Sequence, residues 1–291
     1  MTFNIRRLSS ASEFSSVAGP FLMRNEAHNG LILGLAATLE VAPRFYGDEE
    51  PYLALAFDGA DVAGAALMTP PRAVVLSLFA DNSAVEALAE DVLAFRRTTA
   101  GVTGPLPGPL QFAEAWQRLT GDAFVVQIAE RCYKLERLIP PSDVRGTARL
   151  ATEAVLQVLT DWRMAFAAEA VPHEASSREE VEKYTRQRFA AAPERVGTFL
   201  WEVDGQPVSM ASYSSPTPNS LRIGGVYTPP EFRRRGYASA CTAATCEFIL
   251  ASGRSFATLF TDLANPTSNR IYQAIGFAPV CDAVQYGFVR G

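Results

Sequence analysis

The chain has 291 residues, of which 48% are hydrophobic and 20% charged, and its formal net charge is −5. This composition is typical of a globular protein, and the length suffices for two domains. The acidic balance argues against a nucleic-acid partner, because such proteins usually carry a basic face, but it allows a small anion to be held at one spot.

In the first half, the apolar stretch 30–39 predicts a buried helix, since it is too short to span a bilayer. Further along, two apolar runs in residues 52–70 meet at Asp58-Gly59, which predicts a hairpin because both residues tolerate positive φ. The remaining expected elements are a helix (84–97), a glycine- and proline-rich loop (101–109) and a long strand or strand pair (124–138).

The second half has a clearer order of elements. Antiparallel strands come first and a strand–helix–strand unit follows, which indicates the α+β or mixed α/β class. The expected elements are helices 153–168 and 178–191, strands 197–203, 208–214 and 221–227, helix 237–252 closed by Gly253, strand 256–261, helix 266–275 stopped by Gly276, and two last strands, 277–281 and 286–290.

The two halves echo each other. Asp204-Gly205 also lies between apolar runs, 146 residues after Asp58-Gly59 (204 − 58). Similar hairpins at a constant offset predict a duplicated domain, although hairpins are common enough for coincidence to be the alternative. Segment 139–146 holds two prolines and a glycine and is the expected linker between domains 1–138 and 147–291.

Cysteine and histidine content and the N-terminus restrict the class further. The four cysteines form no C-x-x-C pair and only two histidines are present, so we expect no metal site and reduced, mostly buried thiols. The first seven residues do not resemble a signal peptide. We therefore expect a cytoplasmic protein with no membrane partner.

The most informative segment, residues 223–238, joins a strand to a helix and contains Arg233, Arg234, Arg235 and Gly236. Gly236 has no side chain, so the turn can bring backbone N–H groups close to an anion. The following helix start adds unpaired N–H groups and the positive end of the helix dipole, which together suit a pyrophosphate. The alternative for the three arginines is a solvated loop.

Arg233-x-x-Gly236-x-Ala238 resembles the Q/R-x-x-G-x-G/A motif with which acyltransferases of the GNAT superfamily hold the pyrophosphate of acyl-CoA. The resemblance implies a GNAT-like mixed sheet flanked by helices, with acetyl-CoA as cosubstrate. It also implies that the corresponding strand splays to admit the pantetheine arm. The residues implied in cofactor binding here are Val226, Thr228, Arg233, Arg234, Arg235, Gly236, Tyr237, Ala238 and Ser239.

A second segment begins with Asn265-Pro266, where asparagine caps and proline suits the first turn of a helix. Asn265, Asn269 and Tyr272 then share one face, which could also be only a cap and a surface tyrosine. Asn269-x-x-Tyr272-x-x-x-Gly276-Phe277 resembles the GNAT segment in which the asparagine contacts CoA and the tyrosine protonates the leaving thiolate. The resemblance covers roughly residues 146–291 and implies that Tyr272 is the general acid and that Asn269 contacts CoA. We expect Asn265 to act mainly as the helix cap, a role that is compatible with binding CoA.

The first half departs from the motif. The stretch at the 146-residue offset, residues 87–92, has no Arg-x-x-Gly-x-Ala, and Glu86, Glu90 and Asp91 would repel phosphate. This half resembles a degenerate GNAT-like domain that has lost cofactor binding.

No general base stands out in the sequence. Glu202, Glu169, Glu174 and His173 are open candidates, and each alone is more often an ordinary surface residue. We expect an N-acetyltransferase acting on a small-molecule or peptide amine, the alternative being a non-catalytic acyl-CoA-binding or interaction domain.

Overall fold

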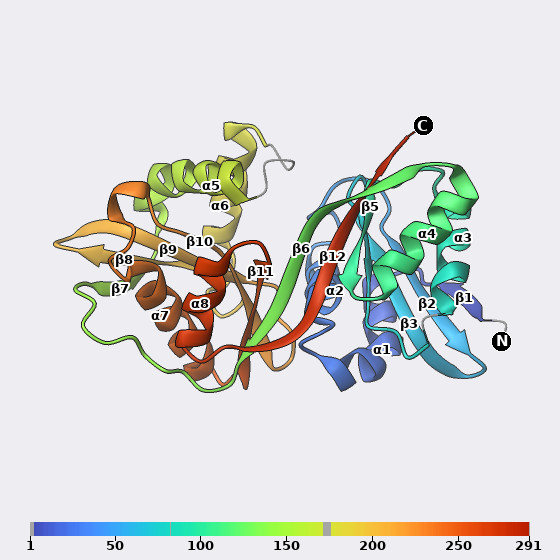
Figure 1. Cartoon of the computed structure of the whole chain (residues 1–291), viewed down its shortest axis with the longest axis horizontal. Helices are drawn as coiled ribbons and strands as arrows, with labels where there is room; N and C mark the ends of the chain where they lie inside the picture. Colours follow the sequence, from blue (N-terminus) through green and yellow to red (C-terminus); the bar gives the residue numbers. More distant parts are fainter. Residues whose placement is uncertain (1–2, 82, 171–175, 291) are drawn as a thin grey trace. The chain divides into compact units, whose positions relative to one another are not determined.

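The computed structural model describes residues 3–81, 83–170 and 176–290. The chain divides into two compact units. Unit 1 comprises Met1–Tyr133, Thr261–Asn265 and Pro279–Gly291, and unit 2 comprises Lys134–Phe260 and Pro266–Ala278. The described helices and strands of the whole chain are drawn in Figure 1.

Unit 1 is a sheet with helices on both faces. Its strands lie in the order β1-β2-β3-β4-β5-β12-β6. Its elements are β1 (Asn4–Arg7), α1 (Ala11–Leu22), η1 (Met23–Asn25), α2 (Gly30–Val41), β2 (Tyr52–Asp58), β3 (Asp61–Met68), β4 (Val74–Leu76), α3 (Ala84–Phe95), β5 (Gly101–Pro105), α4 (Gly108–Thr120), and most of β6 (Ala123–Leu135) and β12 (Ala278–Val289).

The two cores of unit 1 follow from the alternation of side chains along β2. Leu53 and Leu55 pack in the core that α1 and α2 supply, whereas Tyr52, Ala54 and Ala56 pack with α3 and α4. Successive side chains of a strand point to opposite faces, so a strand covered on both faces is apolar throughout. The buried helix expected at residues 30–39 is α2, and it belongs to the first of these cores.

Unit 2 repeats this plan with its own sheet, whose strands lie in the order β11-β10-β9-β8-β7. Its elements are β7 (Thr147–Leu150), η2 (Glu153–Val155), α5 (Leu156–Ala170), α6 (Arg178–Ala190), β8 (Gly197–Val203), β9 (Gln206–Ser214), β10 (Ser220–Tyr227), η3 (Pro230–Phe232), α7 (Tyr237–Ala251), most of β11 (Phe256–Asp262), and α8 (Pro266–Ala274). Leu200 of β8 packs against α5, whereas the neighbouring Phe199 packs against Phe248 of α7, so α5 and α7 cover opposite faces of the sheet.

The element order confirms the duplicated, mixed α/β fold. In both halves a strand and two helices precede a hairpin, which is followed by strand, helix, strand, helix and strand. The second hairpin turns at the expected Asp204-Gly205, whereas the first turns one residue later than expected, at Gly59-Ala60, because Asp58 pairs with Asp61. Gly59 has φ +59°, and Asp204 and Gly205 have φ +52° and +77°, the left-handed conformations that a tight hairpin turn requires.

The C-terminal end differs from the expected domain division. Strand β12 pairs with β5, with Val284 opposite Gly104, so residues 279–291 belong to unit 1 and not to the second unit. The expectation of two last strands was wrong, because β12 is continuous. Asp282, which lies between the two expected strands, forms an ion pair with Arg131 of β6 at 2.6 Å, and Figure 1 draws β6 and β12 side by side.

The loop expected at residues 101–109 was also wrong, because β5 and the start of α4 occupy this segment. Two of its glycines allow β5 to lie close to the neighbouring strands, because a side chain there would meet their backbone. A Cβ atom on Gly101 would lie 2.0 Å from the Tyr286 carbonyl oxygen of β12, and one on Gly104 would lie 2.7 Å from the Leu76 carbonyl oxygen of β4. Glycine inside a strand can mark such an approach, and the composition alone does not separate it from a loop.

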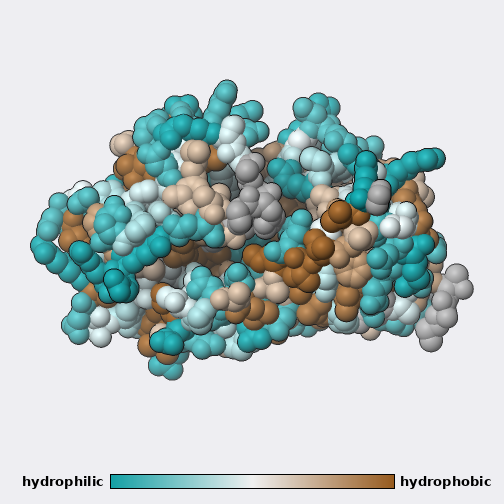
Figure 2. Space-filling view, turned by 45° about the horizontal axis from the view of Figure 1, so that its top comes forward, coloured by the Kyte–Doolittle hydropathy of each residue, from teal (hydrophilic) through white to brown (hydrophobic). Residues whose placement is uncertain are grey.

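The face of the molecule drawn in Figure 2 is largely hydrophilic, with apolar residues between the polar ones. In the described part of the chain, no helix combines the length and the apolar character that a membrane span needs. The four cysteines are free thiols, three of them buried, as the sequence predicts.

Candidate functional site

The turn between β10 and α7 is built from two residues in the left-handed conformation. Arg234 has φ +63° and Gly236 has φ +80°. A Cβ atom on Gly236 would also lie 3.0 Å from Cγ2 of Val144, so both backbone conformation and space favour glycine there. The chain thus reverses sharply and enters α7 directly after Gly236.

The first turn of α7 presents backbone N–H groups that its own chain does not satisfy. The first helical bond of this turn runs from the Ala240 N–H to the Gly236 carbonyl oxygen at 3.0 Å. The N–H groups of Tyr237, Ala238 and Ser239 therefore have no acceptor within the helix. No side chain caps the helix and no acidic residue occupies its first turn. This helix start fits a phosphate group, because its N–H groups and dipole both favour negative charge.

The three arginines of the turn have different environments. Arg233 donates from its Nη2 to both carboxylate oxygens of Glu169 at 2.8 Å, and from its Nε to the Thr228 carbonyl oxygen at 2.9 Å. Arg233 therefore braces the turn against the end of α5. Arg234 and Arg235 are exposed and have no hydrogen-bonded or ionic partner within the described ranges.

Strand β10 leaves its parallel neighbour halfway along its length. Across the described residues, its pairing with β11 runs from Ser220 to Ile223 and does not continue. On the other side, the register with β9 shifts between Gly224 and Tyr227, where Gly225 adopts φ +59°. A bulge with a left-handed glycine bends a strand and leaves backbone groups unpaired. This is the departure from β11 that the sequence resemblance implies.

Val226 lies within the bulged part of β10, and Thr228 directly follows the strand. The Thr228 hydroxyl lies 2.8 Å from the Ser209 hydroxyl, and its carbonyl oxygen accepts from Arg233. The side chain of Thr228 is thus engaged with β9, so contact with a ligand at this position would use its backbone or methyl group.

Tyr272 lies on α8 and is 9% exposed. Its ring packs edge-on against Phe277 at 6.0 Å between centroids. Burial, with a smaller contribution from nearby Cys246 of α7, raises the pKa of Tyr272 to about 12. Because of this raised pKa, the phenol is protonated at neutral pH. Its hydroxyl has no hydrogen-bond partner within the described part of the chain, so it is free to donate.

The two expected asparagines lie at the start of α8 and within its first turns. Asn265 directly precedes α8, and Asn269 lies one turn before Tyr272. The Asn265 N–H donates to the Asp262 carbonyl oxygen at 3.0 Å. Asn269 and Tyr272 are three residues apart and share one helical face, as the sequence predicts.

Two of the candidate bases are engaged elsewhere. Glu202 accepts from Arg149 on β7 at 2.6 Å, and Glu169 is the partner of Arg233. His173 and Glu174 lie outside the described residues. No group of three or more His, Cys, Asp or Glu side chains that could hold a metal ion occurs in residues 3–81, 83–170 and 176–290.

Two arginines between the helices and the sheet of unit 2 were not among the expected site residues. Arg188 of α6 is buried against the sheet, and Arg163 of α5 is partly buried, with a buried Nε atom and a hydrogen bond to Thr198 of the sheet. A signal for Arg163 was present, since it is four residues after Leu159 and three before Phe166 and so falls on the apolar face of its helix. A charged residue on the apolar face of a helix indicates that polar groups lie between the helix and the sheet on which it packs.

Comparisons with known proteins agree on one fold. Residues 156–277 match the family model described as the acetyltransferase (GNAT) family. No curated protein is similar enough to be matched.

Several solved structures are similar over most of the chain. One is a GCN5-related N-acetyltransferase from Kribbella flavida, 22% identical with a TM-score of 0.56, covering 79% of this chain and 88% of that one. A second, a GCN5-related N-acetyltransferase from Sphaerobacter thermophilus, is 16% identical with a TM-score of 0.61, covering 99% and 96%. A third, described as a tandem GNAT protein from the clavulanic acid biosynthesis pathway, is 14% identical with a TM-score of 0.60, covering 99% and 98%. At these identities the similarity concerns the fold.

Proposed function

We propose, from the premise that residues 156–277 form a GNAT-family acetyltransferase domain, that the chain moves an acetyl group from acetyl-CoA to a primary amine. Membership of this family implies acyl transfer from acyl-CoA. The acetyl donor, the amine acceptor and the roles of individual residues are the proposal. The observation that carries it is the uncapped start of α7 at Gly236, which directly follows the bulged strand β10.

The cosubstrate is proposed to bind along these two elements. Its pyrophosphate would accept from the N–H groups of residues 234–239, while its pantetheine arm would lie beside the unpaired part of β10, near the backbone of Val226 and Thr228. Arg234 and Arg235 are free to reach phosphate, whereas Arg233 would act mainly by holding the turn through Glu169. Asn269 of α8, and Asn265 directly before this helix, would contact CoA.

Tyr272 is proposed as the general acid. A neutral amine attacks the thioester carbonyl, a C–N bond forms, the C–S bond breaks with the electron pair on sulfur, and the attacking nitrogen releases one proton to solvent. The Tyr272 hydroxyl gives its proton to that thiolate and is reprotonated from solvent. Its burial supports a role as proton donor, because the phenol keeps its proton until about pH 12.

The test is acetyl-CoA turnover across a panel of amines, followed as free CoA thiol, together with calorimetric titration of acetyl-CoA alone. The proposal expects saturable acetyl-CoA binding and amine-dependent thiol release. Binding without release for any amine would favour the non-catalytic acyl-CoA-binding alternative. Absence of binding would refute both.

A further inference from the structure

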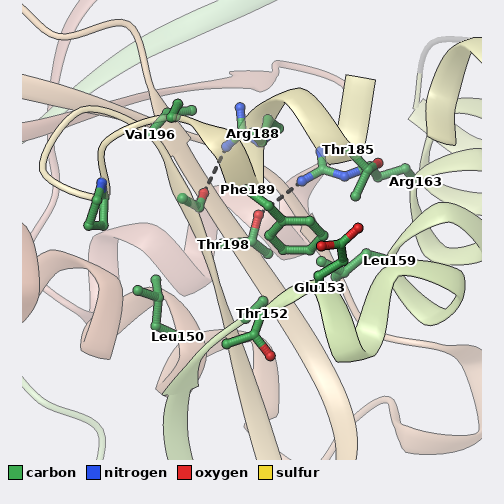
Figure 3. Close-up of a pocket in the computed structure, with 14 residues that line it drawn as sticks. Leu150, Thr152, Glu153, Leu159, Arg163, Thr185, Arg188, Phe189, Val196 and Thr198 are labelled. Carbon is green, nitrogen blue, oxygen red and sulfur yellow. Dashed lines mark hydrogen bonds between the residues drawn. The ribbon is translucent and has the colours of Figure 1, made fainter. Parts of the chain in front are cut away.

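Unit 2 contains a pocket of about 300 Å³ on the face of the sheet that α5 and α6 cover. Figure 3 shows its lining residues, which come from α5, α6, the end of β7 and the start of β8. Most of the wall is apolar, and two guanidinium groups enter it. The apolar lining includes Leu159, Phe189 and Val196, and the two guanidinium groups are those of Arg163 and Arg188.

Neither guanidinium group has all its donors satisfied. Arg163 donates from Nη2 to the hydroxyls of Thr198 and Ser212, at 2.9 and 3.1 Å. Arg188, which is 7% exposed, donates to the carbonyl oxygens of Gly197 and Tyr213, at 2.7 and 2.8 Å. The Nε atoms of both arginines are buried and have no acceptor in the described part of the chain.

The two positive charges also have no negative partner. No carboxylate lies within 4.0 Å of either guanidinium group across residues 3–81, 83–170 and 176–290. Glu153 belongs to the pocket wall, but its side chain is 73% exposed and lies 3.9 Å from Arg186 on the outside of α6.

Tyr184 is the other titratable group beside the pair. Arg188 donates to its hydroxyl at 3.1 Å, and Arg163 lies 5.6 Å from the centre of its ring. Desolvation opposes ionisation of Tyr184, yet the nearby guanidinium groups outweigh it and lower its pKa. Tyr184 is 40% exposed, so solvent screens part of this effect, and a neutral phenol does not balance two cations.

Burying a charge without a counter-ion is unfavourable, and hydroxyl and carbonyl oxygens offset only part of the cost. Desolvation, together with repulsion from Arg188, lowers the pKa of Arg163 to about 10, which reflects the same imbalance. An anion placed between the two arginines would supply both the missing charge and acceptors for the unsatisfied Nε groups.

We propose that this pocket binds a small organic acid, with its carboxylate on Arg163 and Arg188 and its apolar body against Leu159, Phe189 and Val196. The apolar wall distinguishes such a ligand from inorganic phosphate, which has no apolar surface to bury. The pocket shares none of its lining residues with the proposed acyl-CoA site.

The experiment is calorimetric titration of the full chain with butyrate, and with the isosteric neutral butyramide, at equal ionic strength in chloride. Acetyl-CoA is absent, so the result does not depend on the proposed function. We expect saturable binding of butyrate, weaker binding of acetate and inorganic phosphate, and none of butyramide. Equal responses to butyrate and butyramide, or no response to any anion beyond that of chloride, would overturn the proposal.

The variant Arg163→Met tests the residue. Its hydroxyl partners, Thr198 and Ser212, lie 2.9 Å from each other and stay hydrogen-bonded when the guanidinium is removed. We expect affinity for butyrate to fall at least about tenfold, as the loss of a charge-assisted hydrogen bond implies. Arg186→Met, which removes an exposed arginine of α6 that does not line the pocket, is the matched control and should bind as the parent does.

A second variant covers the case in which Arg163→Met does not fold. Val196→Glu places a carboxylate in the pocket wall, where it can pair with the arginines and exclude an external anion. Loss of butyrate binding in a folded Val196→Glu protein is the expected result. Retention of parental affinity in either variant would show that the two arginines serve only to fasten α5 and α6 to the sheet.

Discussion

The start of α3 in unit 1 and the start of α7 in unit 2 occupy the same place in the repeated order of elements, yet their charges differ. Before α3, Asp81 accepts from the backbone N–H and the hydroxyl of Ser83, at 2.9 and 2.7 Å. These bonds lower the pKa of Asp81, so it stays ionised. Glu86 adds a second negative charge in the first turn. Unit 1 therefore supplies its own anion at the helix start, whereas α7 begins at Gly236 with none.

The strands before these helices differ in the same direction. Strand β4 has three residues, and both Val74 and Val75 pair in regular parallel register with β5. Strand β10 has eight residues, a bulge and a free edge after Ile223. The helices α4 and α8 differ too, since α4 contains no tyrosine and buries Trp116 instead. The bulge and the unpaired edge on which the proposed cosubstrate site depends therefore occur in β10 and not in β4.

The strongest test of this comparison is Gly236→Glu. A carboxylate at the start of α7 would imitate Asp81, repel the pyrophosphate and clash with Val144, so we expect acetyl-CoA affinity to fall about 100-fold or more by calorimetry. The matched control is Ser83→Glu before α3, which should leave affinity unchanged. Undiminished binding by a folded Gly236→Glu protein would remove the anion site from α7.

Tyr272→Phe addresses the tyrosine that α4 lacks. Phenylalanine keeps the packing on Phe277 and removes only the hydroxyl, so kcat should fall about 100-fold while the Kd for acetyl-CoA stays within about twofold. Tyr286→Phe is the control, because Tyr286 is similarly buried and belongs to β12 of unit 1. A Tyr272→Phe enzyme that turns over like the parent would require another acid.

The glycines after α4 and α8 provide a comparison of stability. Both have positive φ, +81° at Gly121 and +107° at Gly276. A Cβ atom on Gly121 would meet nothing within 4 Å, whereas one on Gly276 would lie 2.5 Å from the Arg137 carbonyl oxygen. In urea denaturation we expect Gly121→Ala to lower the free energy of unfolding by about 1 kcal/mol, and Gly276→Ala by about 3 kcal/mol. Equal losses would mean that the backbone near Arg137 yields.

The smallest expected effect concerns pH. The Tyr272 pKa is raised to about 12, so its acid form is fully present below pH 10 and is lost only as pH rises through the raised value. Titration of Tyr272 should therefore not lower kcat/KM between pH 7 and 10. In this range the pH profiles of the parent and of Tyr272→Phe should have the same shape. A limb near pH 9 that the substitution removes would show that the hydroxyl is more acidic than its burial implies.

The sequence by itself determined the features that depend on neighbours along the chain. The hairpin turns at Gly59 and Gly205, the sharp turn at Gly236 and the start of α8 at Pro266 all rest on the conformational preferences of single residues. The order of most strands and helices around these turns could also be predicted, because it too depends on local sequence patterns.

Tertiary structure decided which distant segments meet. The sequence contains no signal that β12 pairs with β5, because a strand's alternation does not name its partner. Arg233 was assigned to phosphate from its motif, yet it bonds Glu169, 64 residues away. Arg163 and Arg188 likewise line one pocket only because their two helices pack on the same sheet. Long-range pairing follows from the packing of complete elements, which is why local sequence patterns did not predict the pocket that Arg163 and Arg188 line.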